Sequence, residues 1–131
     1  QKVDGPYATA VANWMHAIRE GVDPFITGDG EQRRDMAHVE DVVSANIFAM
    51  NYESRFEGIH YDVGTGENIS LNEIKEIILR HHPGVEFEYR PPRQGDVKET
   101  KAKIGPLLEL GWMPRIDIYS GIENCFTKES K

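Results

Sequence analysis

Two kinds of apolar spacing alternate along this chain, and glycine and proline turns separate the segments that carry them. Within residues 7–20, four apolar side chains recur at the spacing of one helical face: Val11, Trp14, Met15 and Ile18. Residues 24–27 form a short β-rich run that ends at Gly28. This alternation of short helices and short strands predicts an α/β fold, in one domain or in part of a larger one.

The same alternation continues to the end of the sequence. Ser70 and Glu73 form a capping-box pattern, and Pro106 and Gly111 mark the start and the end of a short helix. A period-two pattern runs up to a pair of prolines and predicts a half-exposed strand. We therefore expect further helices at 39–50, from Ser70 to Arg80, from Pro106 to Gly111 and after Asp117, and further strands at about 59–63 and 85–90.

Each of the longer expected helices carries an apolar stripe on one face. The stripes are Val43, Ile47 and Met50 in the second helix, Ile74, Ile77 and Ile78 in the third, and Ile118, Ile122, Cys125 and Phe126 in the last. Glu40 and Asp41 fall in the first turn of the second helix, where the helix dipole favours negative charge.

The charge of the chain limits its partners. With a formal net charge of −7, the chain lacks the basic stripe that nucleic acid or an anionic membrane requires, so any anion site must be local. No run of about 18 apolar residues is present, and residues 1–20 lack the order of a signal peptide, which predicts a cytoplasmic protein without a membrane span. Cys125 is the single cysteine, so we expect neither an internal disulfide nor a metal site.

Arginines in two separate loops are the candidate anion ligands. Arg34 lies between a glycine turn and the second expected helix, and Arg93 lies in the loop PPRQGDV. A guanidinium group presents a planar fork of donors that suits two oxygens of a phosphate, so two such side chains can clamp a diphosphate. The alternative is that these arginines and Arg33 form weak, exposed salt bridges with neighbouring carboxylates such as Asp35, Glu40 or Asp96. Composition alone does not decide between the two.

The segment VGTGENIS matches a dinucleotide-binding glycine loop only in part. Ile69 stands where the third glycine of a GxGxxG loop would be. Gly64 and Gly66 therefore predict a tight turn between a strand and a helix. We also find no Ser/His/Asp or Cys/His arrangement of nucleophile and base, and we assign no catalytic residue to the chain.

Three motifs, in a single order, resemble those of a known family. They are GDGEQRRDMAHVEDVVSA, YDVGTGENISLNEIKEII and PPRQGDVKETKAKIGPLLELGWMPRIDIYSGI. Together they are similar to the C-terminal part of extended short-chain dehydrogenases/reductases, specifically nucleotide-sugar epimerases and dehydratases of the UDP-glucose 4-epimerase type. The resemblance implies that residues 1–131 are the C-terminal nucleotide-sugar-binding region of an NAD-dependent epimerase/dehydratase of extended Rossmann type, with the N-terminal Rossmann half absent.

The resemblance also assigns roles to particular residues. Arg34 matches the family arginine after the GDGEQ turn, and Arg93 matches the arginine of its RxGD loop, so both are expected to hold the diphosphate of a UDP-sugar. Asp96 matches the aspartate of that loop, which accepts hydrogen bonds from ribose hydroxyls. The strand from Phe25 to Thr27 matches the segment whose backbone meets the uracil, although Thr27 replaces a common aromatic residue.

The catalytic groups of the family are not in this sequence. The family's N-terminal half supplies a GxxGxxG loop for the dinucleotide, a Ser or Thr that polarises the sugar hydroxyl, and a TyrxxxLys pair. The chain contains no GxxGxxG, and none of its five tyrosines has a lysine four residues later. The resemblance thus implies NAD as the cofactor of the full-length parent, no cofactor for this chain alone, and no activity without the N-terminal half. The alternative is a truncated, non-catalytic binding or interaction module derived from the same family.

The resemblance has a consequence for folding as well. In relatives, the YDVG strand and the helix after HVEDV belong to the nucleotide-binding part of the enzyme. Apolar sides of these elements would lose their partners here, at about 25 cal/mol for each Å² that stays wet. We therefore expect the chain to self-associate through an exposed apolar face or to rearrange its strand pairing.

Overall fold

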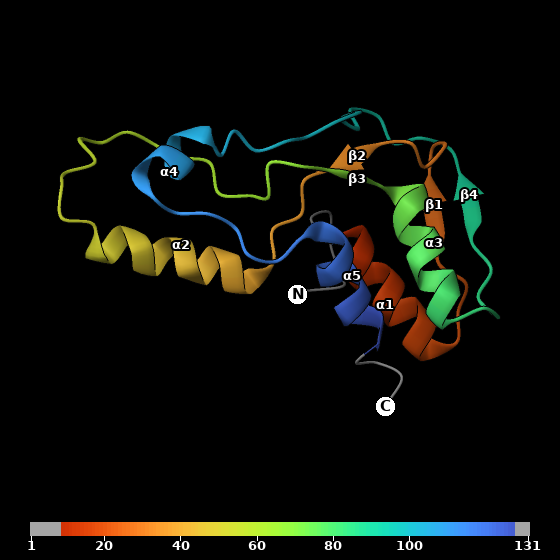
Figure 1. Cartoon of the computed structure of the whole chain (residues 1–131). Helices are drawn as coiled ribbons and strands as arrows, with labels where there is room; N and C mark the ends of the chain where they lie inside the picture. Colours follow the sequence, from red (N-terminus) through yellow and green to blue (C-terminus); the bar gives the residue numbers. More distant parts are fainter. Residues whose placement is uncertain (1–8, 128–131) are drawn as a thin grey trace. The chain divides into compact units, whose positions relative to one another are not determined.

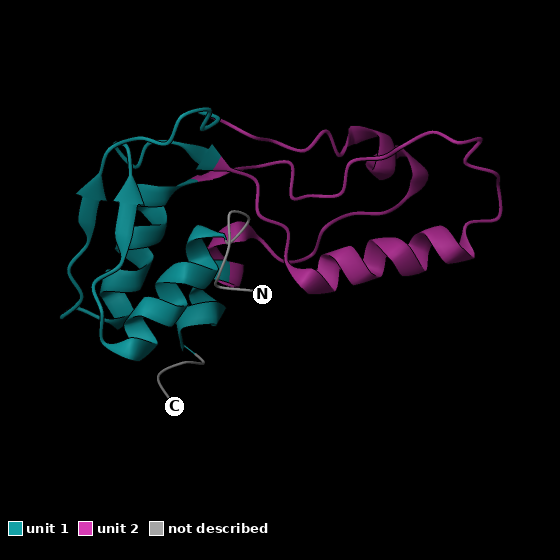
Figure 2. Cartoon of the chain, turned by 180° about the vertical axis from the view of Figure 1, so that it is seen from behind, with its two compact units in different colours: residues 1–33, 70–98, 122–131 teal, residues 34–69, 99–121 magenta. Residues whose placement is uncertain are grey.

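The chain folds into two compact units that are interleaved in sequence. The structure is a computed structural model that describes residues 9–127. Of these, unit 1 contains residues 9–33, 70–98 and 122–127, and unit 2 contains residues 34–69 and 99–121 (Figure 2). Helices and short strands follow one another along the chain (Figure 1), which confirms the predicted α/β class. The first two residues of the helix expected at 7–20 lie outside the described residues.

Unit 1 contains two complete helices, the larger part of a third, and a pair of parallel strands. The complete helices are α1 (Ala10–Glu20) and α3 (Leu71–His81), and the strands are β1 (Phe25–Thr27) and β4 (Glu88–Arg90). β1 pairs with β4 in parallel, with Thr27 opposite Arg90. β4 is shorter than the strand expected at 85–90, but it ends where the proline pair was predicted to stop it.

The core of unit 1 is closed by large apolar side chains. Trp14, Ile74 and Phe126 are at most 2% exposed. The predicted capping box of α3 is present, because the Ser70 side chain accepts from the Glu73 N–H while the Glu73 side chain accepts from the Ser70 N–H. The predicted inward stripe of this helix is buried at all three positions: Ile74, Ile77 and Ile78.

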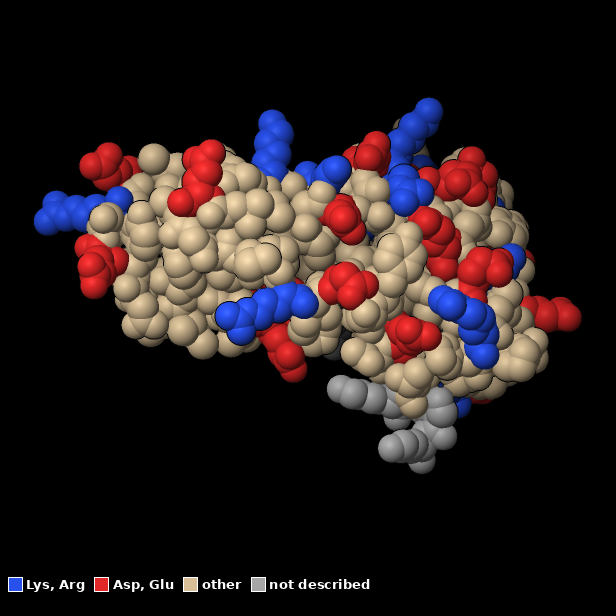
Figure 3. Space-filling view, viewed as in Figure 1, with Lys and Arg blue, Asp and Glu red and all other residues tan. Residues whose placement is uncertain are grey.

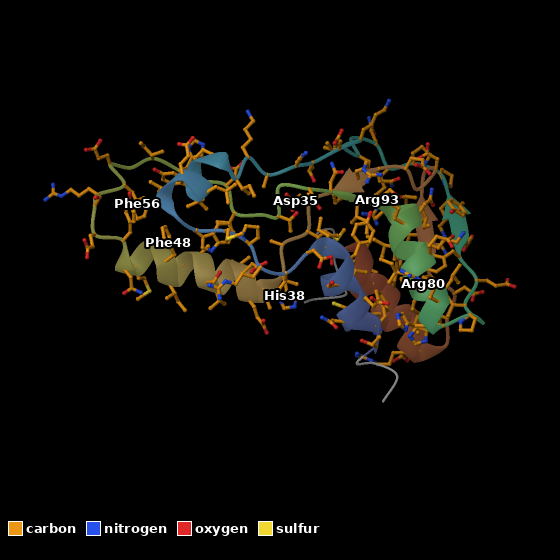
Figure 4. All side chains as sticks on the ribbon, in the orientation of Figure 1. Asp35, His38, Phe48, Phe56, Arg80 and Arg93 are labelled. Carbon is orange, nitrogen blue, oxygen red and sulfur yellow. The ribbon has the colours of Figure 1, made fainter. Side chains whose placement is uncertain are left out.

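Unit 2 contains the helices α2 (Val39–Asn51) and α4 (Gly105–Leu110) around a small core. The buried members of that core are Ala45, Leu107 and Trp112. Phe48 and Phe56, labelled in Figure 4, belong to a run of four neighbouring aromatic rings, Phe48, Tyr52, Phe56 and Tyr61, whose successive centroids lie 5.7, 4.9 and 5.6 Å apart.

The ends of the two C-terminal helices follow the predicted signals. Pro106 lies in the first turn of α4, and Gly111 ends that helix with a left-handed φ of 110°. Helix α5 (Ile118–Thr127) starts after Asp117, which accepts the Ser120 N–H at 3.0 Å, and it carries the chain from unit 2 into unit 1. Its inward residues Ile118, Ile122 and Phe126 are buried, and Cys125 is half-buried.

The prediction of a strand at residues 59–63 was wrong. These residues pair with no strand of the described chain, whereas the neighbouring segment forms β3 (Ile69–Ser70), which pairs with β2 (Arg33–Arg34). A β-strand needs a partner strand for its backbone donors and acceptors. The local apolar pattern does not show whether such a partner is available.

The apolar stripe of α2 is open to solvent. Val43, Ile47 and Met50 are 52%, 53% and 83% exposed, and Val39 in the first turn is 67% exposed. The opposite side of the helix buries Asp41 and Ala45. In the view of Figure 3 the middle of the surface over α2 is free of charged side chains, which lie near its two ends. Contiguous apolar surface of this kind is unusual on a monomer.

A membrane-spanning helix needs about 20 apolar residues. None of the helices between residues 9 and 127 meets this requirement in length and hydropathy.

Candidate functional site

The candidate base-binding strand, β1, has one edge occupied by β4. Gly28 N–H donates to the Arg90 carbonyl and Glu88 N–H donates to the Pro24 carbonyl, at 2.8 and 3.0 Å. Because carbonyls alternate in direction along a strand, those of Phe25 and Thr27 face away from β4. Both accept a side-chain donor from unit 1. Phe25 O takes the indole N–H of Trp14 at 2.8 Å, and Thr27 O takes the amide of Gln32 at 2.7 Å.

The face of Phe25 is also covered from within unit 1. The guanidinium carbon of Arg90 lies 3.9 Å from the centroid of the Phe25 ring, which is a close cation–π contact. Arg90 is held from its other side by Glu88, at 2.9 Å. The half-buried Phe25 side chain is therefore part of the packing of β1 against β4.

The PPRQGDV loop follows β4 and forms a turn with Arg93 and Asp96 at its ends. The Asp96 N–H donates to the Arg93 carbonyl at 3.3 Å, and Gly95 supports the turn with a left-handed φ of 79°. Both side chains are exposed (Figure 4 labels Arg93). An oxygen of the Asp96 carboxylate accepts from the Gln32 amide nitrogen at 3.3 Å. Gln32 therefore links Asp96 to Thr27, two residues for which the family resemblance predicts a role in nucleoside binding.

The two neighbouring arginines of β2 have different surroundings. Arg33 pairs with Glu73 at 3.0 Å, and the same Glu73 oxygen accepts the Ser70 N–H of the α3 capping box. A salt bridge was the alternative reading for Arg33, and the structure confirms it with a partner from α3 in place of the neighbouring carboxylates expected. Arg34 is half-buried and is the first residue of unit 2, so its part in anion binding stays a prediction from the resemblance.

Asp35 organises the backbone next to Arg34. One carboxylate oxygen accepts the N–H and the hydroxyl of Thr65 at 3.0 and 2.8 Å, and the other accepts the N–H groups of Gly66 and Ala102 at 3.0 and 3.1 Å. The Asp35 N–H donates to the Thr100 carbonyl at 3.2 Å. One side chain thus holds three stretches of unit 2 together, a role that was not recognised in the sequence.

The glycine turn of residues 64–66 does not fit a dinucleotide. A Cβ atom at Gly64 would lie 2.5 Å from the Ala102 side chain and 2.9 Å from Asp35, and one at Gly66 would lie 2.8 Å from Ile104. The glycines admit the chain's own side chains where a phosphate loop would leave space for its ligand. This agrees with the predicted turn, and no NAD site is assigned to the described residues.

Asp41 has a structural role that its position in the first turn of α2 did not reveal. It is 3% exposed, and its two oxygens accept the backbone N–H groups of Arg115 and Ile116 at 3.0 and 3.1 Å. The neighbouring Glu40 is exposed and has its N–H bound by the His38 ring at 3.2 Å. Only Asp41 of this carboxylate pair anchors another segment of unit 2.

Unit 2 also contains an open pocket of about 290 Å³. The residues around it are Asp35, Ala37, Val63, Gly64, Thr100, Lys101 and Ala102. Its one carboxylate, Asp35, is already engaged by four donors. Across residues 9–127, no three histidine, cysteine or acidic side chains gather as metal ligands would. His81 pairs instead with Glu123 at 3.0 Å.

Comparisons with known proteins identify the family. Residues 2–64 match the model of the NAD dependent epimerase/dehydratase family. A relative from Methanocaldococcus jannaschii is 35% identical over 118 residues, which cover 88% of this chain and 37% of the relative. The UDP-glucose 4-epimerase of Mycolicibacterium smegmatis is 33% identical over 117 residues, with 88% and 37% covered.

A solved structure of UDP-glucose 4-epimerase from Thermotoga maritima, with UDP-glucose, matches at a TM-score of 0.84 and 30% identity. The match covers 100% of this chain and 43% of that one. The chain belongs to the NAD-dependent epimerase/dehydratase family, and its structural neighbours are Rossmann-type epimerases. It spans little more than a third of the length of the curated relatives that it matches.

Proposed function

We propose that this chain is the C-terminal, substrate-binding region of an NAD-dependent nucleotide-sugar epimerase or dehydratase, and that it grips the diphosphate and nucleoside of a UDP-sugar. The sequence contains neither the GxxGxxG loop nor the TyrxxxLys pair, and its glycine turn at residues 64–66 is filled by the chain's own side chains. In this proposal NAD binding and proton transfer come from the N-terminal half of the parent enzyme, and the chain is inactive without it.

The observation that supports the proposal best is the linkage of Thr27 and Asp96 through Gln32 in unit 1. The β1 backbone for a base and a carboxylate for ribose hydroxyls would need to be held together to bind one nucleoside. The Thr27 carbonyl, which takes one donor from Gln32, has a second lone pair for such a contact. Arg93 begins the same turn that carries Asp96, so a diphosphate attached to that ribose would start close to this guanidinium. Arg34 is proposed as the second phosphate ligand on the strength of the family motif.

Electrostatics give these arginines their importance. The chain carries a net charge of −7, which repels a diphosphate at long range. A guanidinium that stays charged and donates two parallel hydrogen bonds provides local attraction and orientation. The proposed site therefore depends on a few positive groups, and removing one of them should have a large effect on binding.

Calorimetric titration of the chain with UDP tests this function. Loss of a hydrogen bond to a charged group lowers affinity roughly tenfold to a hundredfold, so Arg93→Ala and Arg34→Ala should each weaken UDP binding by that factor. Arg80, an exposed arginine at the end of α3, provides the control, and Arg80→Ala should bind UDP like the parent. Equal UDP affinity in the parent and in both site variants would refute the arginine assignment.

We also propose that the chain pairs with a second copy through the exposed stripe of α2. Val43, Ile47 and Met50 form an exposed apolar stripe on α2 that a second copy could cover. Sedimentation over a concentration series should show association for the parent, and Ile47→Lys should shift the chain toward a single copy because it places a charge in the buried contact. A parent that stays a monomer at all concentrations would contradict this.

A further inference from the structure

Gln32 occupies an unusual position in unit 1, since a single side-chain nitrogen joins two segments that lie far apart in sequence. The amide nitrogen lies 2.7 Å from the carbonyl of Thr27 and 3.3 Å from a carboxylate oxygen of Asp96. The backbone of Gln32 is itself held, because its carbonyl accepts the N–H of Leu71 at the start of α3.

The chemistry of the amide explains why glutamine suits this position. Both neighbours are acceptors, and the NH₂ group of an amide offers two hydrogens, one for each of them. The carbonyl oxygen of the same amide could serve neither, so the orientation of the side chain is fixed by its partners. Without this group, the Thr27 carbonyl and the Asp96 carboxylate would lose the donor that they share, and the turn that carries Asp96 would lose its link to β1.

We propose that Gln32 is a positioning residue for the nucleoside: it holds the Asp96 carboxylate at a set distance from the edge of β1, so that base and ribose are recognised together. The inference rests on the proposed function, and it adds a residue other than the two proposed phosphate ligands, Arg34 and Arg93. The Gln32 amide nitrogen donates to Thr27 and Asp96, the two residues proposed for the nucleoside, so its loss should weaken nucleoside binding and leave diphosphate binding largely unchanged.

Two ligands separate these effects: UDP, which carries the nucleoside, and inorganic pyrophosphate, which lacks it. Gln32→Met keeps the length of the side chain but removes both donors. We expect it to weaken UDP binding about tenfold and to change pyrophosphate binding less than twofold. Gln94→Met is the matched control, because Gln94 is exposed in the same loop as Asp96, and it should change neither affinity.

A second variant covers the case in which Gln32→Met folds poorly. Gln32→Glu keeps the size of the side chain but turns a donor into a third acceptor and adds a negative charge. We expect a larger loss of UDP affinity than with methionine, and a smaller loss of pyrophosphate affinity from the added charge. UDP affinity unchanged in a folded variant, or equal losses for UDP and pyrophosphate, would overturn the inference.

Amide hydrogen exchange at Gly95 and Asp96 provides a readout that needs no ligand. In the parent these amides should exchange more slowly than in Gln32→Met, because the turn loses its link to β1 in the variant. A parent that binds no UDP would refute the proposed function, and this exchange would still test Gln32 separately. Equal exchange in parent and variant would show that Gln32 does not position the turn.

Discussion

The two units are stabilised in different ways. Unit 1 closes around large apolar side chains, among which Trp14, Ile74 and Phe126 are at most 2% exposed. Unit 2 has a small apolar core and relies on two carboxylates, Asp35 and Asp41, that bind backbone N–H groups of other segments. A carboxylate can replace apolar contacts in this way because each of its oxygens satisfies donors that would otherwise be buried without partners.

The same difference explains where apolar surface remains exposed. Unit 2 turns the carboxylate side of α2 inward and leaves Val43, Ile47 and Met50 in solvent. Unit 1 has no comparable helix, since α3 buries its whole isoleucine stripe. Unit 2 is therefore held together largely by buried or half-buried carboxylates and leaves the apolar stripe of α2 exposed. Unit 1, in contrast, buries the apolar stripe of α3.

The largest expected effect lies in the apolar core of unit 1. Phe126→Ala should lower the free energy of unfolding by about 3–5 kcal/mol, since it removes a ring that is 1% exposed and leaves a cavity. Met50→Ala, which truncates a side chain that is 83% exposed, should change it by less than about 0.5 kcal/mol. Urea unfolding followed by circular dichroism measures both. Similar losses for the two variants would mean that the contrast between the units is wrong.

A somewhat smaller effect is expected at the buried carboxylate of unit 2. Asp41→Asn replaces one accepting oxygen by an NH₂ group, so one of the two N–H groups of Arg115 and Ile116 loses its acceptor. We expect a loss of about 2–3 kcal/mol in thermal or urea unfolding. Glu40→Gln, one residue earlier and exposed, is the control and should be near neutral. If Asp41→Asn left the free energy of unfolding unchanged, unit 2 would not depend on this carboxylate for its stability.

The smallest effect is expected at Asp117, an exposed carboxylate that accepts a backbone N–H group as Asp35 and Asp41 do. Hydrogen bonds from Ser120, from its side chain and then from its backbone N–H, lower the pKa of this carboxyl below its usual 3.8. A lowered pKa means that the charged form stabilises the fold above the ordinary pKa and that this contribution is lost as the pH falls through the folded value. Asp117→Ala should cost about 1 kcal/mol at pH 7, and the difference from the parent should shrink at pH 3. A stability difference between the parent and Asp117→Ala that grew as the pH fell would contradict a lowered pKa for this carboxyl.

Local signals in the sequence predicted much of the fold. The capping box of α3 and the Pro106 and Gly111 ends of α4 act within a few residues, so the sequence shows them directly. Pairings between distant segments could not be predicted in this way. The parallel register of β1 with β4, and the absence of a partner for residues 59–63, depend on which strands meet in space.

The residues of the candidate site also differ in how far the sequence could predict their roles. The family resemblance predicts nucleoside-binding roles for Thr27 and Asp96, and the structure adds that Gln32 joins these two residues. No local pattern marks Gln32, Asp35 or Asp41, because their roles come from acceptors or donors far along the chain. The shared role of Arg34 and Arg93 stays a prediction, because they belong to different units.

The interleaving of the units sets the order in which a newly made chain can fold. β1 leaves the ribosome long before β4, its only strand partner in the described chain, and the Phe126 ring that completes the same core comes later still. Unit 2 likewise has all its segments only once residue 121 has been made, shortly before Phe126. Both units therefore stay partly open while most of residues 9–127 are made, and β1, the earliest strand, depends longest on protection from premature association.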